Sequence, residues 1–274
     1  MTTTTAKPSD GLQQGQKKRS RDASSLSSKP QERQRKKQKS ISEIPTEQKQ
    51  DQPAKTAELS DINPAWAKLA PTSTAARFTE RLAKTHTSLS TIELDDLDLP
   101  VQSIQDTSSF APQRTLPSLP EFLEQNTPNG SVELKESSSE QGCPHTLILS
   151  LSAIRSMHVK RAVDKYGTSE SKIAKLFSKH IKYDEAVSYL EKTRVGIGVG
   201  TAGRIEELIV GKDGKKGVLK LEALKRVILD VSYLDEKKRG LIEDIPAFKA
   251  LVTLLNVEEL KLRFAKGETK ILFF

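Results

Sequence analysis

The chain has 274 residues, of which 35% are hydrophobic, and it carries a formal net charge of +8. This length suits one domain with tails, and the basic charge favours a nucleic acid or another polyanion as a partner. A single cysteine excludes an internal disulfide framework, and the four histidines do not have the spacing of metal ligands. The sequence shows neither a secretory signal nor a membrane span. We therefore expect a soluble intracellular protein without a metal.

Charge divides the chain into three segments. Residues 1–60 carry a net charge of +6, residues 61–142 carry −6, and residues 143–274 carry +8. We expect a disordered basic tail, an irregular acidic anchoring segment rich in proline, and a folded α/β domain, in that order.

The predicted tail has no aromatic residue and is rich in Ser, Thr, Gln and Lys. Such a segment cannot bury enough apolar surface to offset the entropy lost on ordering. It holds two basic clusters with a polar spacer between them, a pattern typical of a nuclear import signal. The residues of this signal are Lys17, Lys18, Arg19, Arg21, Arg33, Arg35, Lys36, Lys37 and Lys39. A basic tail that touches RNA is a compatible alternative, and both interpretations predict a nuclear protein.

Seven prolines interrupt residues 61–142, and short apolar anchors stand between them. A helix over residues 72–86 is the regular element that we expect here. The pattern predicts a chain that wraps a domain or a partner through spaced anchors, and a plain linker is the alternative. Trp66, the only tryptophan, favours anchoring, because tryptophan is uncommon in disordered spacers. The other anchors are Phe78, Leu94, Leu97, Leu99, Phe110, Leu116, Leu119, Phe122 and Leu123.

Strands alternate with helices in residues 143–274. Apolar runs predict strands over residues 146–151, 195–199, 227–231 and 270–274. Helical spacing predicts helices over residues 152–165, 169–181, 184–192, 202–210, 221–225, 245–255 and 257–265. Residues 211–217 form a loop signal. This order predicts an α/β domain of three layers, with a parallel sheet covered by helices on both faces.

A glycine-rich stretch follows the second of these strands and opens a helix, which is where open α/β sheets bind ligands. Gly198, Gly200 and Gly203 match the spacing G-x-G-x-x-G, whose amides approach a pyrophosphate, and Asp230 would hold a ribose. This pattern supports the hypothesis of an enzyme that binds a nucleotide or dinucleotide. Against it, the motif is not in the first βαβ unit, and Asp230 lies further on than the ~20 residues usual in that motif.

A second hypothesis starts from Thr201-Ala202-Gly203-Arg204, which resembles the T-P-G-R motif of DEAD-box RNA helicases. In that family the motif caps a helix and holds the RNA backbone. The chemistry fits, because Thr201 can cap the helix while free amides and Arg204 contact a phosphate. Residues 147–155 and 224–233 resemble the P-T-R-E-L-A and V-L-D-E-A-D segments of the same family, in the same order.

The departures from the helicase pattern predict a protein without catalysis. Val231 replaces the glutamate that activates water, Tyr233 replaces the last acid, and no G-x-x-x-x-G-K-[ST] loop occurs. Phosphoryl transfer depends on positioning and on electrostatic stabilisation of the phosphates. The resemblance therefore implies a single, incomplete RecA-like domain that lacks the phosphate loop. We expect no cofactor and no bound nucleotide, and a structural role for Asp230.

The whole pattern resembles the Cms-one-like family of early small-subunit (90S) pre-ribosome proteins, over residues 143 to about 260. The resemblance implies a non-catalytic subunit of the small-subunit processome, in the nucleus and nucleolus, that acts in rRNA processing by binding pre-ribosomal proteins and RNA. We expect the RNA contacts at Thr201, Gly203, Arg204, Lys212, Lys215 and Lys216. A third hypothesis, besides the nucleotide-binding enzyme and this pre-ribosomal subunit, is a nuclear adaptor that binds protein only.

Overall fold

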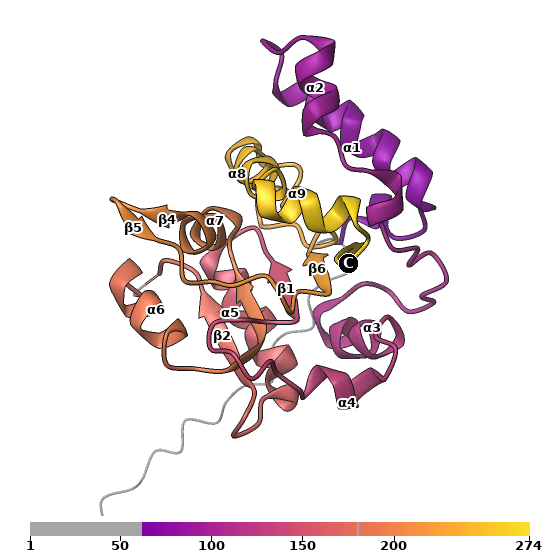
Figure 1. The fold of residues 1–274 in the computed structure, drawn as a ribbon. Helices are drawn as coiled ribbons and strands as arrows, with labels where there is room; N and C mark the ends of the chain where they lie inside the picture. Colours follow the sequence, from indigo (N-terminus) through magenta and orange to yellow (C-terminus); the bar gives the residue numbers. More distant parts are fainter. Residues whose placement is uncertain (1–61, 180) are drawn as a thin grey trace, which may run out of the picture. The chain divides into compact units, whose positions relative to one another are not determined.

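The structure is a computed structural model that describes residues 62–179 and 181–274. These residues belong to one unit that spans Ala54–Phe274 (Figure 1). The predicted disordered tail and both basic clusters of the predicted import signal lie outside the described residues.

A parallel sheet lies at the centre of the described residues. It has five strands in the spatial order β2-β3-β1-β6-β7. The strands are β1 (Thr146–Leu149), β2 (Lys172–Leu176), β3 (Val195–Gly200), β6 (Arg226–Leu229) and β7 (Lys270–Phe273). Every residue of the three inner strands is buried, as expected for a sheet covered on both faces.

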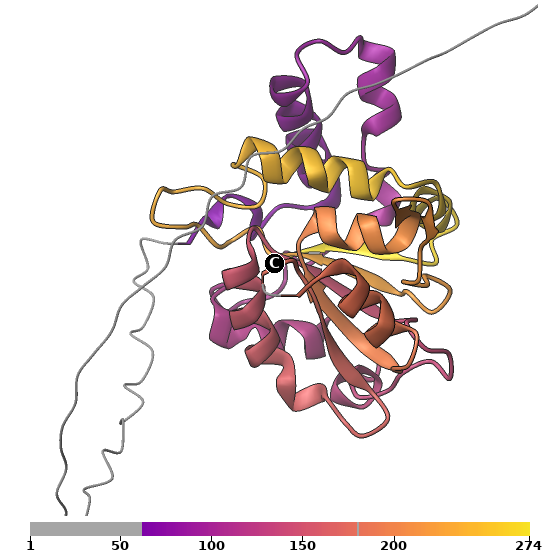
Figure 2. The ribbon, with the colours of Figure 1, turned by 90° about the vertical axis from the view of Figure 1, so that its left-hand side faces the viewer.

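Helices cover both faces of this sheet (Figure 2). One face packs against α3 (Leu119–Gln125), α4 (Gly130–Leu134) and α5 (Ala153–Val163). The opposite face packs against α1 (Pro71–Thr85), α2 (Thr91–Leu97), α6 (Tyr183–Leu190), α7 (Ala202–Val210), α8 (Ile245–Leu255) and α9 (Glu258–Ala265). The predicted α/β class and its three layers are confirmed.

The alternation of side chains along each strand builds two separate cores. Leu147 and Leu149 of β1 belong to the core under α7 and α8, whereas Ile148 between them belongs to the core under α5. Period-two alternation in a buried strand has this result, because successive side chains point to opposite faces.

Short elements connect the layers. Four 3-10 helices are η2 (Pro64–Trp66), η3 (Val101–Ser103), η4 (Leu116–Ser118) and η5 (Asp164–Tyr166), all within the described residues. A small antiparallel hairpin pairs β4 (Gly211–Lys212) with β5 (Lys215–Lys216). Asp213 and Gly214 at its tip have φ of 52° and 77°, the positive values that a tight two-residue hairpin turn requires. The predicted loop over residues 211–217 therefore contains this hairpin.

Two predicted helices are wrong. Residues 169–181 contain the edge strand β2 instead of a helix. The spacing of Ile173, Leu176 and Phe177 fits a strand as well as a helix. The inner edge of this strand contacts glycines of β3. Residues 221–225 form only a turn, in which the Leu224 N–H donates to the Leu221 carbonyl at 2.8 Å. The other predicted helices and all four predicted strands are present, with ends that differ by a few residues.

The predicted anchors in the acidic segment are largely buried. Trp66 stacks on Phe273 with ring centroids 5.4 Å apart, and Phe78 meets Phe248 edge to face at 5.2 Å. Phe122 meets Phe274 in the same way at 4.9 Å. Aromatic pairs of this kind add to the stabilisation from apolar burial. The predicted helix over residues 72–86 is confirmed as α1, whereas the division of the chain at residue 142 stays a prediction.

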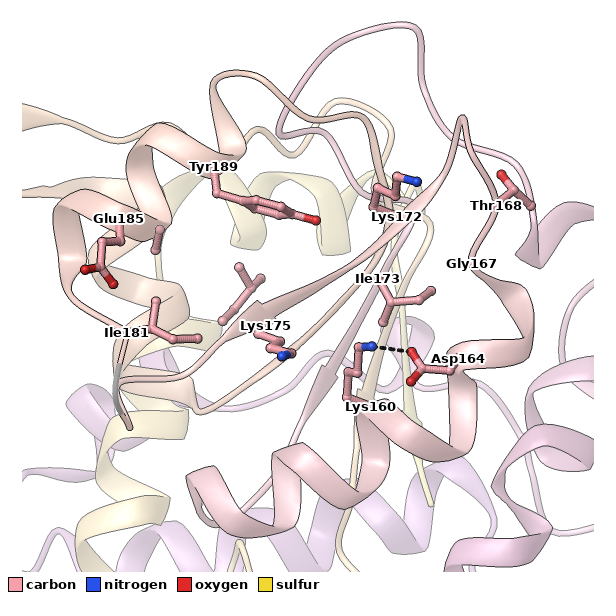
Figure 3. Close-up of a pocket in the computed structure, with 12 residues that line it drawn as sticks. Lys160, Asp164, Gly167, Thr168, Lys172, Ile173, Lys175, Ile181, Glu185 and Tyr189 are labelled. Carbon is pink, nitrogen blue, oxygen red and sulfur yellow. Dashed lines mark ion pairs between the residues drawn. The ribbon is translucent and has the colours of Figure 1, made fainter. Parts of the chain in front are cut away.

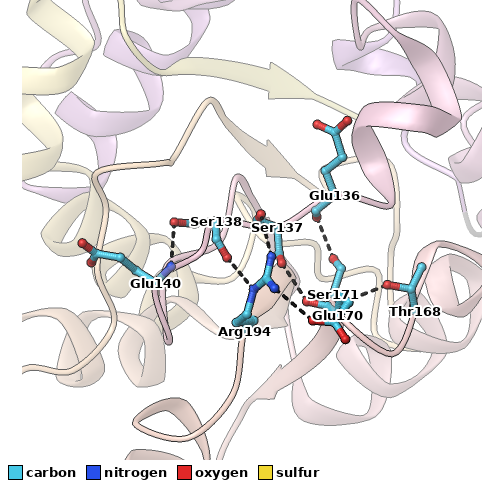
Figure 4. Close-up of polar contacts among 8 residues, drawn as sticks. All are labelled: Glu136, Ser137, Ser138, Glu140, Thr168, Glu170, Ser171 and Arg194. Carbon is cyan, nitrogen blue, oxygen red and sulfur yellow. Dashed lines mark hydrogen bonds and ion pairs between the residues drawn. The ribbon is translucent and has the colours of Figure 1, made fainter.

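A strap of residues 136–140 covers the amino-terminal ends of β2 and β3 (Figure 4). The Ser171 hydroxyl, just before β2, donates to the Glu136 carbonyl at 2.6 Å. Arg194, just before β3, donates through Nε to the Ser138 carbonyl at 2.9 Å and pairs with Glu170 at 2.9 Å. The strap thus joins the acidic segment to the edge of the sheet opposite the predicted binding site.

Candidate nucleic-acid interface

The carboxyl edge of the sheet has a topological switch point between β1 and β6. After β1 the chain forms β2 and β3 on one side of that strand, and then crosses to form β6 and β7 on the other. Open α/β sheets bind ligands in the crevice at such a point. The site therefore depends on which side chains occupy the ends of β1 and β6.

A buried ion pair fills this crevice. Asp230 directly follows β6 and is 1% exposed, and Arg155 in the first turns of α5 is 7% exposed. Arg155 donates through Nε to Oδ2 at 2.7 Å and through a second nitrogen to Oδ1 at 3.0 Å. The Tyr233 ring lies 4.3 Å from the guanidinium carbon. Asp230 thus has Arg155 as a bidentate partner, and a ribose would have to displace the Arg155 guanidinium.

Two segments from the acidic region cover the ends of β6 and β7. The Asn63 N–H donates to the Ser232 carbonyl at 2.7 Å, beside Trp66 on Phe273. Arg114 is 3% exposed and donates to the carbonyls of Phe273 and Thr107. Burial lowers the pKa of Arg114 to about 10, so it remains charged at neutral pH. We call these ends, with residues 62–67 and 107–114, the covered half of the edge.

The glycines of β3 are needed for contact with β2. Gly198 and Gly200 lie inside the strand, and a Cβ at Gly200 would stand 1.9 Å from the Leu176 carbonyl oxygen. A Cβ at Gly198 would meet the Leu176 side chain at 2.7 Å, whereas Gly203 has open space. The predicted turn through all three glycines is therefore wrong as a description of the backbone. Close approach of two strands explains the first two glycines without a phosphate.

The other end of the edge, formed by β1, β3 and β2, we call the open half. Here α5 and α7 begin next to each other, after the neighbouring strands β1 and β3. The Ser152 hydroxyl accepts from the Arg155 N–H at 3.3 Å and caps α5. Thr201 stands at the N-cap of α7 with an extended backbone, but its side chain makes no capping bond, contrary to our expectation. The first amides of a helix attract anions when no side chain caps them.

Arg204 is directed towards α6. Its side chain is 10% exposed, and Nε lies 3.2 Å from a carboxylate oxygen of Glu207. It also donates to the Ile181 carbonyl at 3.3 Å and lies 6.0 Å from the Tyr183 ring. An RNA phosphate would therefore compete with Glu207 for this guanidinium.

The hairpin lysines differ in their partners. Lys212 pairs with Glu207 at 2.7 Å, which raises its pKa, and Lys215 pairs with Asp184 at 2.5 Å, which raises its pKa as well. Lys216 is exposed and has no ion pair with a described residue. The helix α7 separates Thr201 and Gly203 at its start from the hairpin at its end, a length of roughly 13 Å for nine residues. The predicted RNA-binding residues therefore form two groups rather than one.

Sequence reasoning missed two of the residues that define this edge. Arg155 lay in a segment that resembled a helicase motif, but it was given no role. Arg114 was one of few basic residues in an acidic segment, and this isolation is the signal that could have marked it as a buried cation. Ser150, directly after β1, is 1% exposed, and its hydroxyl has no hydrogen-bond partner among the described residues.

The described residues contain neither a metal-binding cluster nor a membrane-spanning helix. No group of three or more His, Cys, Asp or Glu side chains there is placed to hold a metal ion. No helix in the same residues is long and apolar enough to cross a bilayer. Cys143 is buried, and burial raises the pKa of its thiol.

Comparison with known proteins identifies a family. The family profile described as "CMS1: U3-containing 90S pre-ribosomal complex subunit" matches residues 2–274. Protein CMS1 of Chaetomium thermophilum is 36% identical over 215 residues, which cover 78% of this chain and 83% of that protein. Protein cms1 of Schizosaccharomyces pombe is 30% identical over 69% of this chain and 64% of its own length. Protein CMSS1 of Homo sapiens is 36% identical over 62% of this chain and 57% of its own length.

Solved structures with some similarity include two helicase-related chains. A DEAD box protein from Methanococcus jannaschii is 19% identical, with a TM-score of 0.32, over 53% of this chain and 34% of that chain. S. cerevisiae dbp5 l327v, bound to nup159, gle1 h337r, ip6 and adp, is 12% identical, with a TM-score of 0.38, over 71% of this chain and 45% of that chain.

Proposed function

The chain belongs to the CMS1 family of U3-containing 90S pre-ribosomal complex subunits, and from this premise we propose that it is a non-catalytic subunit that binds RNA and protein during rRNA processing in the nucleolus. Membership in this complex gives it a role in ribosome biogenesis. The observation that carries the proposal is the divided carboxyl edge of the sheet, which is closed at the switch point and open at the ends of β1 and β3.

The closed part of the edge supports a non-catalytic function. Asp230 is held by Arg155, and Val231 beside it is fully buried where a helicase has its glutamate. Hydrolysis of a phosphoanhydride needs charged groups that are free to act on the phosphates and on water. The groups that remain here are already paired with one another.

The open part of the edge supports contact with an RNA backbone. Two neighbouring helices begin there, and the N-cap Thr201 leaves the first amides of α7 uncapped. These amides and the positive end of the helix dipole attract a phosphate. Contact with phosphates positions an RNA without reading its sequence. We therefore propose that this chain binds the RNA backbone with little sequence preference, with Thr201 and Gly203 nearest to the phosphate.

The test is RNA affinity of the Thr201→Asp variant. Aspartate is a good N-cap, so the variant folds, but its charge competes with the phosphate at the same amides. We expect binding of full-length chain to a labelled oligouridine, followed by fluorescence anisotropy, to weaken about tenfold or more. Ser90→Asp is the matched control, because Ser90 caps the exposed end of α2 and receives the same added charge. Equal affinities for the two variants would contradict the proposal.

The hairpin provides a second, weaker contact in this proposal. Lys216 has no ion pair with a described residue, so Lys216→Glu should reduce affinity and the salt dependence of binding. Lys212, Lys215 and Arg204 would contribute only after they release Glu207 or Asp184. If affinity and salt slope do not change in the Lys216 variant, the hairpin is not part of the RNA site.

The pairing of Arg204, Lys212 and Lys215 with carboxylates favours the nuclear adaptor that binds only protein as a second candidate. Cross-linking in cells separates the two candidates. RNA cross-links between Gly196 and Lys216 support the RNA-binding subunit, and their absence supports the adaptor. Calorimetric titration with ATP, NAD and NADP tests the enzyme hypothesis, for which micromolar affinity is the expected sign.

Nuclear import through the two basic clusters stays a proposal. Replacing the nine lysines and arginines of the predicted import signal by alanine should move the chain from the nucleus to the cytoplasm. Fluorescence microscopy of the tagged full-length chain is the measurement. Unchanged nuclear enrichment would show that another part of the chain, or a bound partner, directs import.

A further inference from the structure

The outer edge of β2 is free of a partner strand within the described residues. β2 pairs only with β3, through contacts such as the Lys172 N–H to the Arg194 carbonyl at 3.0 Å and the Thr201 N–H to the Leu176 carbonyl at 3.2 Å. Backbone groups alternate in direction along a strand, so those of Ile173 and Lys175 point away from β3. Such a row of unpaired donors and acceptors is a template for another strand.

A cleft of about 630 Å³ runs along this free edge (Figure 3). The helix α5 and the turn after it form one wall, and α6 with Ile181 before it forms the other. Ile173, Ile181 and Tyr189 give the cleft an apolar surface, and Lys172 and Lys175 of β2 lie at its strand side. Tyr189 is 41% exposed, so its ring offers apolar surface to a ligand in the cleft. The cleft thus offers both backbone hydrogen bonds and apolar contacts to an extended chain.

The net charge of the cleft is positive. Lys160 pairs with Asp164 at 2.6 Å, and Glu185, which accepts from the Lys182 backbone N–H at 3.1 Å, contributes one negative charge. Lys172 and Lys175 have no ion pair with any described residue and are exposed. These two positive charges favour acidic side chains on a peptide that binds beside them.

The same lysines argue against a second copy of this chain as the occupant. Pairing of two β2 edges would place Lys172 and Lys175 of one copy next to those of the other, and like charges on adjacent strands repel. Lysine on an edge strand commonly prevents such self-association. An RNA would satisfy the lysines, but it would leave the outward amides and carbonyls of β2 and the apolar walls unused. An acidic strand from another protein satisfies all three features.

We propose that the cleft beside β2 binds an extended acidic peptide of a protein partner, which adds a sixth strand to the sheet. Main-chain hydrogen bonds to Ile173 and Lys175 provide the affinity, as in other cases of β-strand addition. Apolar side chains on the peptide face next to α6 contact Ile181 and Tyr189, and an acidic side chain on the opposite face pairs with Lys175. A second acidic side chain, at the end of the peptide, pairs with Lys172 at the start of β2. This site goes beyond the proposed function and does not depend on RNA binding at the open half.

Titration with a soluble peptide of alternating Glu and Val tests the site directly. The full-length chain is labelled with nitrogen-15, and the amide signals and hydrogen exchange of β2 are followed. We expect the amides of Ile173 and Lys175 to shift and to exchange more slowly, and a peptide of alternating Lys and Val to cause neither change. Equal effects of the two peptides, or changes confined to other residues, would overturn the proposal. Protection of the same amides by oligouridine would also overturn it.

Charge reversal makes the test independent of any general loss of structure. The double variant Lys172→Glu, Lys175→Glu should bind the Glu-Val peptide at least about tenfold more weakly and should bind the Lys-Val peptide instead. The matched control, Lys249→Glu with Lys266→Glu, changes two exposed lysines outside the cleft and should bind like the unaltered chain. A folded cleft with reversed charge should prefer the Lys-Val peptide. If that peptide does not bind the Lys172→Glu, Lys175→Glu variant, the proposed pairing is contradicted.

Discussion

The two halves of the carboxyl edge occupy equivalent positions in the fold, but they differ in which residues cover the strand ends. In the covered half, the ends of β6 and β7 lie beneath Trp66 and Arg114, and the carbonyls of Ser232 and Phe273 accept hydrogen bonds from Asn63 and Arg114. In the open half, α5 and α7 begin side by side, and Thr201 makes no capping bond. The first half behaves as core, and the second keeps the groups that a ligand needs.

Under the proposed function, the difference separates a part of the edge that is stabilised internally from a part that binds a ligand. Buried charges are tolerated only when they are paired and hydrogen-bonded. Arg155 and Asp230 meet this condition through each other, so the switch point needs no ligand. The start of α7 in the open half has no side-chain cap. This contrast predicts that changes in the covered half affect stability, whereas changes in the open half affect binding.

The largest expected effect comes from breaking the ion pair at the switch point. Asp230→Leu leaves the buried Arg155 without its partner and should lower the free energy of unfolding by about 3–5 kcal/mol. Urea denaturation followed by circular dichroism measures it. The double variant Arg155→Met, Asp230→Leu is the control and should recover most of the loss. A loss below about 1 kcal/mol for the single variant would mean that the pair does not hold the two strand ends together.

Trp66→Ala tests the cover itself. Loss of the ring that stacks on Phe273 should lower the free energy of unfolding by about 3 kcal/mol, within the range for large aromatic side chains in cores. Affinity for oligouridine should stay unchanged, because the open half is not touched. Trp66→Phe, which keeps an aromatic ring in place, is the milder control. Stronger RNA binding after removal of the ring would show that the covered half also holds an RNA site.

A pH experiment tests the amino-terminal edge of the sheet, which lies opposite both halves and contains His145 just before β1. Burial, followed by the charge of Arg226, lowers the pKa of His145 to about 4 from 6.5. Below pH 6.5 the unfolded chain therefore binds a proton that the folded chain does not, and stability falls as the pH drops towards 4. At pH 5 this amounts to about 2 kcal/mol. The variant His145→Gln should show a correspondingly smaller loss between pH 7 and pH 5. Equal losses in both proteins would contradict a neutral buried imidazole.

The smallest effect belongs to a helix cap in the open half. Ser152→Ala removes the side chain that accepts from the Arg155 N–H and should cost about 1 kcal/mol. The same urea titration measures it. Ser90→Ala at the start of α2 is the matched comparison. A loss as large as that of Trp66→Ala would mean that the open half is as tightly coupled to the core as the covered half, and the comparison would fail.

Periodicity predicted most of the domain, and its failure at residues 169–181 has a physical cause. The strands of residues 146–149 and 226–229 are short, apolar and fully buried, so their pattern is unambiguous. Residues 172–176 have two exposed lysines, because one edge of β2 faces solvent, and the mixed pattern also fits a helix. What decides the outcome is the glycine-rich neighbour β3, which lets β2 approach closely. A local sequence pattern cannot predict a contact between strands that are distant in sequence.

The place of Thr201 in the fold was predicted, whereas the partners of the charged residues were not. Thr201 lies at the start of α7 at the carboxyl edge, as the motif indicated. The partners of Arg204, Lys212 and Lys215 come from Glu207 and from Asp184, and no local motif links residue 184 to residue 215. The pairing of Arg155 with Asp230 likewise joins residues 75 positions apart. Electrostatic partners depend on the fold, so the sequence alone could name the charged residues but not which of them are free.

Mapping RNA cross-links on the chain within purified pre-ribosomes tests the central claim most directly. The account predicts cross-linked peptides at residues 150–155 and 201–216, on the open half of the carboxyl edge and the hairpin beyond it. It predicts none at residues 62–67 or 107–114. Cross-links confined to those two segments, or an absence of cross-links throughout residues 150–216, would contradict it.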